Sequence, residues 1–92
     1  MSSPQEASLQ LASIFEQLGD SSSVQLFLND LCSPAELLAM AERWHIVSLL
    51  QTGASYREIA LQASVSVTTV GRVARTVRYG SGGYALALKE VS

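Results

Sequence analysis

The chain has 92 residues, a formal net charge of −2 and a sequence pI near 5.2, with 48% hydrophobic and only 15% charged residues. A chain of this length is expected to form one domain, and it holds no apolar run of the roughly 20 residues that a bilayer-spanning helix needs. The polar N-terminus lacks the basic residues of a signal peptide and a single cysteine excludes an internal disulfide, so we expect a bacterial-type cytoplasmic protein.

Hydrophobic content is high for a small chain with few charges. The mean hydropathy is +0.24, and a monomer of this size has a large surface relative to its volume. We therefore expect part of the apolar surface to be covered by a second copy of the chain. A homodimer is the predicted state.

The two halves of the chain carry opposite charge. Residues 1–42 contain six acidic residues and no lysine or arginine, a net charge of −6. Residues 43–92 contain six basic and two acidic residues, a net charge of +4. Because nucleic acid repels the first half and attracts the second, a DNA-facing surface should lie in the second half. The positive charge is modest, so two copies would be needed for enough phosphate contacts, which again favours a dimer.

The first 31 residues predict two helices. The sequence SPQE at residues 3–6 combines an N-cap serine, a proline at the first helical position and a capping-box glutamate. The helix that follows has one apolar stripe and stops at Gly19. A short apolar helix is predicted after the serine run at residues 21–23.

A third and longer helix is predicted from Pro34 to about Gln51. Its start has the same N-cap serine, proline and capping-box glutamate, in the sequence SPAE at residues 33–36, and it ends near Gly53. One apolar band runs along it at helical spacing. The members of the band are Leu37, Met40, Ala41, Trp44 and Val47, broadened by Leu38, Leu49 and Leu50.

Residues 55–79 have the pattern of a helix-turn-helix. Ser55 and Glu58 form a capping box for a first helix of about two turns. Small residues then allow a sharp turn, and Ser66 caps a second helix that runs from Val67 to about Tyr79.

The second of these helices is basic on one side only. At about 100° per residue, its polar set falls within about 40° of Thr68 and its valines fall on the opposite side. The polar set is Thr68, Arg72, Arg75 and Tyr79, and the apolar set is Val70, Val73 and Val77. The alternative is an ordinary amphipathic surface helix with solvated arginines. The capped helix and turn in front of it favour the helix-turn-helix.

Six residues are the candidate DNA contacts. Arginine suits phosphates and guanine edges because its planar fork donates hydrogen bonds in pairs. The residues expected at base edges are Thr68, Thr69 and Arg72, and those expected at phosphates are Arg57, Arg75 and Arg78.

The chain ends with a glycine-rich break and a short helix. Residues 80–83 read GSGG, which predicts a hinge, and a helix is expected over Tyr84–Val91. With no strand alternation in the chain, the predicted fold is all-α with about six helices. The predicted organisation within the single domain 1–92 is dimerisation helices at 1–52, a helix-turn-helix at 55–79 and a hinge with a C-terminal helix at 80–92.

No residue set predicts catalysis or metal binding. Cys32 and His45 are the only cysteine and histidine, whereas a structural zinc site wants four ligands. Cys32 is interpreted as a small buried apolar residue and His45 as a helix-surface or interface residue. The glycines of the hinge follow a helix and precede no lysine, so they do not form a phosphate-binding loop. We expect a non-enzyme with no metal and no resident cofactor.

An ordered set of short motifs resembles the Trp repressor superfamily, and within it most closely the small Trp repressor-like YerC/YecD group. The motifs are Leu31-x-Ser33-Pro34-x-Glu36, Ala41-Glu42-Arg43, Gly53-x-Ser55-Tyr56, Val67-x-Thr69-Val70-x-Arg72-Val73, Arg78-Tyr79-Gly80 and Gly83-Tyr84. The likeness covers the chain from about Phe27 to Leu88. It implies an intertwined all-helical homodimer whose two helix-turn-helix units reach successive major grooves.

The resemblance also implies a ligand pocket at Ser33, Arg43 and Arg72, where the Trp repressor holds its tryptophan corepressor. This chain departs from that pattern in three ways. The connection after the third helix is one residue shorter, Val73 stands where the repressor has a glycine, and Trp44 adds bulk. We therefore predict that free tryptophan is not bound, and leave open whether another small molecule is a corepressor. The alternative role of Arg43 is an ion pair with an acidic neighbour such as Glu36 or Glu42 on its own helix.

Three functions follow from these observations. The favoured one is a sequence-specific, dimeric transcriptional regulator that binds double-stranded DNA. The second is a protein-interaction module in which the helix-turn-helix contacts RNA polymerase or another regulator, as the acidic pI allows. The third is a small-molecule-gated repressor with a ligand pocket. None of the three involves a membrane.

Overall fold

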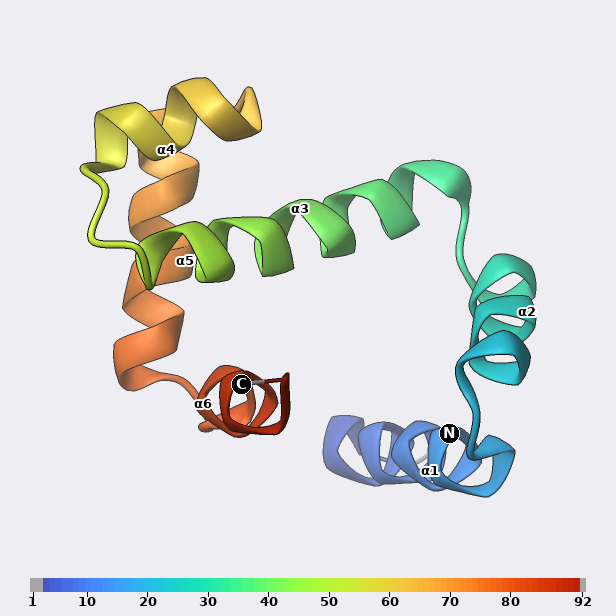
Figure 1. The fold of residues 1–92 in the computed structure, drawn as a ribbon. Coiled ribbons are helices and arrows are strands. Elements are labelled where there is room, and N and C mark those ends of the chain that lie inside the picture. The colour runs from blue at the N-terminus through green and yellow to red at the C-terminus, as the bar shows by residue number, and fades with distance from the viewer. Residues whose placement is uncertain (1–2, 92) are drawn as a thin grey trace. The chain divides into compact units, whose positions relative to one another are not determined.

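The computed structural model describes residues 3–91, which form six α-helices and no strand (Figure 1). The helices are α1 (Pro4–Leu18), α2 (Ser21–Leu31), α3 (Pro34–Leu50), α4 (Tyr56–Ala63), α5 (Val67–Tyr79) and α6 (Gly83–Val91). The all-α prediction and its six helices are confirmed. Within the described part of the chain, none of the helices combines the length and apolarity required to cross a membrane.

Serine side chains begin four of the helices, as the sequence predicts. The hydroxyl of Ser3 accepts the backbone N–H of Glu6 at 3.2 Å, and that of Ser66 accepts from Thr69 at 3.0 Å. Ser33 and Glu36 exchange bonds in both directions, with the carboxylate accepting from the Ser33 N–H at 2.7 Å. Each cap satisfies backbone donors that have no partner inside the helix.

The start of α2 differs from the prediction. The serine run at residues 21–23 is the first turn of the helix and does not precede it. Asp20 is the N-cap, and its carboxylate accepts from the backbone N–H of Ser23 at 2.8 Å and from the hydroxyl of the same residue at 3.0 Å. These bonds, the backbone one first, lower the pKa of Asp20. The serines are helical because the Asp20 carboxylate reaches the Ser23 N–H and takes the N-cap position in front of them.

Two smaller differences concern helix ends. Cys32 is half-buried and not fully buried, because it is the C-cap of α2, with its backbone N–H bonded to Leu28. Gly83 belongs to α6, so the break after α5 is shorter than the four residues predicted. Gly53 follows the end of α3 with φ +80°, a conformation that favours glycine.

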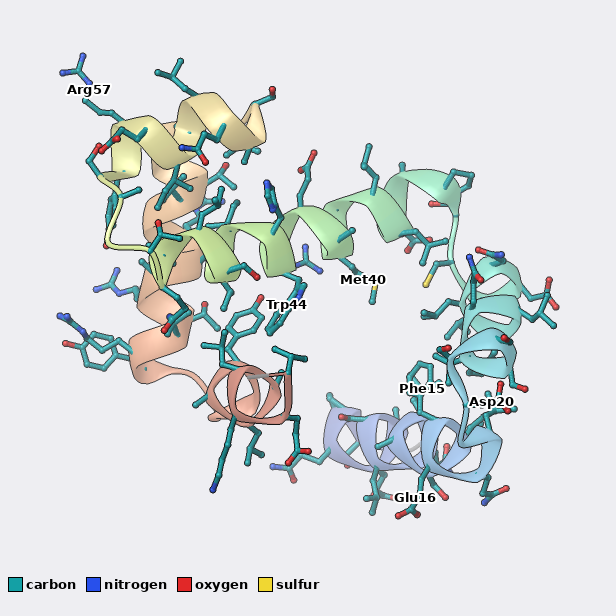
Figure 2. The ribbon with its side chains drawn as sticks, viewed as in Figure 1. Phe15, Glu16, Asp20, Met40, Trp44 and Arg57 are labelled. Atoms are coloured by element: carbon teal, nitrogen blue, oxygen red, sulfur yellow. The ribbon has the colours of Figure 1, made fainter. Side chains whose placement is uncertain are left out.

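The chain divides into two compact units, Met1–Leu37 and Leu38–Ser92. In the first unit α1 and α2 contact each other, and the rings of Phe15 and Phe27 meet edge to face at 5.6 Å with an interplanar angle of 74°. Figure 2 shows Phe15 pointing from α1 toward α2. No residue of either helix is buried.

The second unit holds every buried side chain among the described residues. The core takes two residues from each of three helices, which are Ile46 and Val47 of α3, Ile59 and Ala60 of α4, and Val70 and Val73 of α5. Only the C-terminal half of the predicted apolar band on α3 is covered, since Leu38 and Met40 remain 63% and 43% exposed. Ile46 lies outside the predicted band, yet it is fully buried. The side of α3 that is covered depends on where α4 and α5 pack, and this side includes Ile46.

The last helix is attached to this unit through an aromatic pair. The rings of Trp44 and Tyr84 lie 6.4 Å apart at 34°, and in Figure 2 Trp44 points from α3 toward α6. Tyr84 and Leu88 pack against the core. Trp44 thus contributes packing for α6.

Candidate nucleic-acid interface

The turn between α4 and α5 is short and tightly bonded. Ser64 adopts the left-handed conformation at φ 56° and ψ 45°, which small polar residues tolerate better than β-branched ones. The backbone N–H of Val65 then donates to Ala60 at 3.0 Å, and the Val65 side chain packs against the core. This closes the corner between the two helices, as the sequence predicts for a helix-turn-helix.

The N-terminus of α4 carries a complete capping box. Glu58 accepts from the backbone N–H of Ser55 at 3.0 Å, while the Ser55 hydroxyl accepts from the Glu58 N–H at 3.1 Å. The bond from the Ser55 N–H is the main cause of a lowered pKa at Glu58. The cap fixes where α4 begins and hence where the exposed Arg57 lies, which in Figure 2 extends away from the helix.

The two faces of α5 divide as the angular argument predicts. Val70 is fully buried and Val73 is 4% exposed. On the opposite side Thr68, Arg72 and Arg75 are exposed, and the basic face is solvent-accessible along its length. The apolar face fixes the helix against α3 and α4, so the polar face is presented by a rigid support.

Two hollows flank the exposed face of α5. The first, which we call the α4-side groove, has a volume of about 530 Å³. It is lined by Leu50, Tyr56, Gly71, Ala74, Arg75, Val77, Arg78 and Tyr79. The second, which we call the Arg43–Arg72 cavity, has a volume of about 320 Å³. It is lined by Ala39, Glu42, Arg43, Ile46, Thr69, Arg72 and Val73.

Four of the six predicted DNA-contacting residues line the α4-side groove or the Arg43–Arg72 cavity. Arg75 and Arg78 line the α4-side groove. Thr69 and Arg72 line the cavity on the other side, and the Thr69 hydroxyl lies 2.9 Å from that of Ser66 in the cap. Thr68 is exposed between them, and Arg57 borders a shallow apolar hollow on α4. Five of the six residues thus line three different hollows of the second unit, and Thr68 lies exposed on α5.

The three residues of the predicted ligand pocket belong to two different compact units. Arg43 and Arg72 line one cavity, with Val73 in its wall. Ser33 belongs to the other compact unit, where its hydroxyl caps α3. Arg43 forms no ion pair with another residue of 3–91, and Glu36, one of its suggested partners, is engaged in the cap.

Sequence reasoning missed two residues of the α4-side groove as candidate contacts. Tyr56 is the first residue of α4, and Gly71 lies in the middle of α5. The signal was available for Gly71, since a glycine inside a helix costs about 1 kcal/mol relative to alanine. Tyr56 gave no such signal, because its neighbours across the turn are known only from the fold.

The residues considered for metal binding stand apart from one another. Within residues 3–91, no three histidine, cysteine or acidic side chains come together in a way that could hold a metal ion. His45 is exposed on α3, as predicted for a helix-surface residue.

Comparison with known proteins gives three findings. The profile of the family described as Trp repressor protein matches residues 7–92. An uncharacterized protein of Bacillus subtilis, YerC, is 32% identical over 82 residues, covering 89% of this chain and 79% of the relative. The crystal structure of a TrpR-like protein from Eubacterium eligens aligns with a TM-score of 0.84 at 28% identity, covering 94% of this chain and 89% of that one.

Proposed function

The chain belongs to the Trp repressor family, and from this premise we propose that it is a sequence-specific, DNA-binding transcriptional regulator without catalytic activity. The observation that carries the proposal is the division of α5. Val70 and Val73 are buried in the core, while Thr68, Arg72 and Arg75 face outward from the second helix of a capped helix-turn-helix. Such a helix fits the major groove of B-DNA.

The exposed side chains have distinct roles in this proposal. Thr68, Thr69 and Arg72 lie near the start of α5 and approach base edges, where arginine pairs with guanine and the threonine methyl contacts thymine. Arg57, Arg75 and Arg78 bind phosphates and set the register of the helix on the duplex. This charge supplies the sequence-independent part of the affinity.

The active form is proposed to be a homodimer. The apolar side chains that α1 and α2 leave exposed, among them Leu9 and Leu26 at 71% and 69%, need a covering surface. A second copy also doubles the phosphate contacts of a modestly basic face. Two-fold symmetry would place the two copies of α5 about one helical turn of DNA apart, so the site should be an inverted repeat.

Free tryptophan is proposed not to be the corepressor. Val73 forms part of the wall of the Arg43–Arg72 cavity and takes up space there that a glycine would leave free. Trp44 is not part of that wall, since its ring packs against Tyr84 of α6. Calorimetric titration of the protein with tryptophan should show no saturable binding. Saturable binding at micromolar concentrations would contradict this part of the proposal.

The decisive experiment is selection of bound fragments from sheared bacterial genomic DNA. Purified wild type is compared with an Arg72→Ala/Arg75→Ala variant and with a control, Lys89→Glu, that makes the same change in net charge at an exposed position of α6. We expect the wild type and the control to enrich a short inverted repeat at moderate salt and the α5 variant to enrich nothing. Failure of the wild type to enrich any sequence, together with stable capture of RNA polymerase, would favour the protein-interaction module.

A further inference from the structure

The α4-side groove is more electropositive than the other hollow beside α5. Its lining contains Arg75 and Arg78 and no carboxylate. The Arg43–Arg72 cavity also has two arginines, but Glu42 is part of its wall. Because two uncompensated positive charges in a hollow of about 530 Å³ attract anions, the groove suits a polyanion better than the cavity does.

Both arginines of the groove are free to bind an outside partner. Neither forms an ion pair with another residue of 3–91. The guanidinium carbon of Arg78 lies 6.0 Å from the centre of the Tyr79 ring, at the outer limit of a cation–π contact. Arg75 and Arg78 are three residues apart on α5, so their side chains project from the same side of the helix.

Tyr56 brings a hydrogen-bond donor to the same groove from α4. Its ring lies against α5, since a Cβ placed on Gly71 would be 4.0 Å from the Cε2 atom of Tyr56. The side chain is 45% exposed, and its hydroxyl is bonded to no other residue of the described chain. The ring is thus positioned by contact with α5 while the hydroxyl remains available.

Nothing among residues 3–91 explains why residue 71 is a glycine. Its φ is not in the left-handed region, and a Cβ there would make only an ordinary van der Waals contact. Glycine weakens the interior of a helix relative to alanine. The close approach of something outside the chain to the backbone of α5 would account for a glycine at this position.

We propose that the α4-side groove receives a phosphodiester of the DNA backbone. The hydroxyl of Tyr56 donates to it from α4, and Arg75 and Arg78 donate from α5. Gly71 lets the DNA strand lie close to the helix. This inference rests on the proposed DNA-binding function and adds Tyr56 and Gly71 to the residues that position α5 on the duplex.

The test measures binding to a short duplex of random sequence, because backbone contacts do not depend on sequence. Tyr56→Phe keeps the ring and removes the donor, so binding should weaken about fivefold with an unchanged salt dependence. Arg75→Gln should reduce the slope of log affinity against log salt by about one. Tyr84→Phe, the matched change at the tyrosine that packs on Trp44, should bind as wild type.

Gly71→Ala separates folding from binding. Since the added methyl has room, the thermal midpoint should rise, yet affinity for the duplex should fall because the strand can no longer approach. Wild-type affinity in both Tyr56→Phe and Gly71→Ala would overturn the groove assignment and leave the proposed function intact. A wild type that binds no duplex at all would overturn both.

Free anions provide the last arm of the test. Inorganic phosphate and adenosine monophosphate are titrated against wild type and Arg75→Gln while the thermal midpoint is followed. We expect neither to saturate a site. Saturation that Arg75→Gln abolishes would assign the groove to a free anion and overturn the DNA-backbone proposal.

Discussion

The two compact units differ in how much of their apolar surface the chain itself covers. In residues 38–91, α3, α4 and α5 close around a core in which Ile46, Ile59 and Val70 are inaccessible to solvent. In residues 3–37 no hydrophobic side chain is buried, although α1 and α2 have capped ends and an edge-to-face contact between Phe15 and Phe27. Good local signals for helix formation are therefore present in both units, and a closed core in only one.

The two units therefore differ in whether a closed core stabilises them. The second unit has a three-helix core, and the polar face of α5 is exposed on it. The first unit consists of two helices and one turn of a third, which is too few elements to enclose a core. Its exposed leucines would each gain about 1.5–3 kcal/mol from full burial, which is why we propose that a second copy of the chain covers them.

The largest expected effect is the loss of a core side chain. Ile59→Ala should lower the free energy of unfolding by about 2–5 kcal/mol, because it leaves a cavity in a fully covered site. Denaturant unfolding at a fixed protein concentration measures it. Leu61→Ala on the same helix, where the leucine is 81% exposed, is the control and should change stability by less than about 0.5 kcal/mol. Equal losses would mean that α4 is not packed as described.

The next effect tests whether the first unit is covered by a second copy. Leu9→Glu/Leu26→Glu should raise the dimer dissociation constant about tenfold to a hundredfold, or about 1.4–2.8 kcal/mol, since charges would enter an apolar interface. Sedimentation equilibrium measures the constant. Leu61→Glu/Leu86→Glu makes the same change at exposed leucines of the second unit and should leave it unaltered. A wild type that is monomeric at every concentration would contradict the dimer.

A comparable effect should appear in the DNA affinity when the second unit is altered. Arg72→Ala should cost about 1–3 kcal/mol on the selected site and relax the preference at one base position. Competition binding with the selected site and a random duplex measures the loss of affinity on each. Glu16→Ala in the first unit is the control. Equal losses on the two duplexes would show that Arg72 contacts only the backbone.

The smallest effect concerns the capping carboxylates, which both units use. Hydrogen bonds from Ser55 hold the pKa of Glu58 below its usual 4.5, so the charged form stabilises the folded state. That contribution is complete above pH 4.5 and is lost as the pH falls through the lowered pKa of the folded protein.

Glu58→Gln keeps a side chain that caps but does not titrate. The stability advantage of wild type over this variant should therefore shrink on acidification below pH 4.5, as thermal midpoints across the range would show. Parallel curves for the two proteins would exclude Glu58 as a source of acid sensitivity. Glu36→Gln provides the same test at α3, where bonds from Ser33 lower the pKa of the carboxyl.

Much of the candidate site could be predicted because its signals are local. The caps at Ser55 and Ser66 each join residues three apart, and the valine spacing of α5 follows from the helix period alone. The serine run before Val24 was assigned wrongly for a related reason. Serine and aspartate both cap helices, and the choice of Asp20 over the serines depends on which side chain reaches the Ser23 N–H.

Local sequence signals are sufficient to predict that this chain is helical, that residues 55–79 form a helix-turn-helix and that one side of α5 is basic. Each of these features depends on residues within about one turn of each other. The tertiary structure decided which apolar residues are covered, selecting Ile46 and leaving Leu38 exposed. It alone placed Tyr56 against Gly71 and made a groove beside Arg75. The physical reason is that helical periodicity defines a face, whereas the neighbour that covers this face comes from another part of the chain or from another molecule.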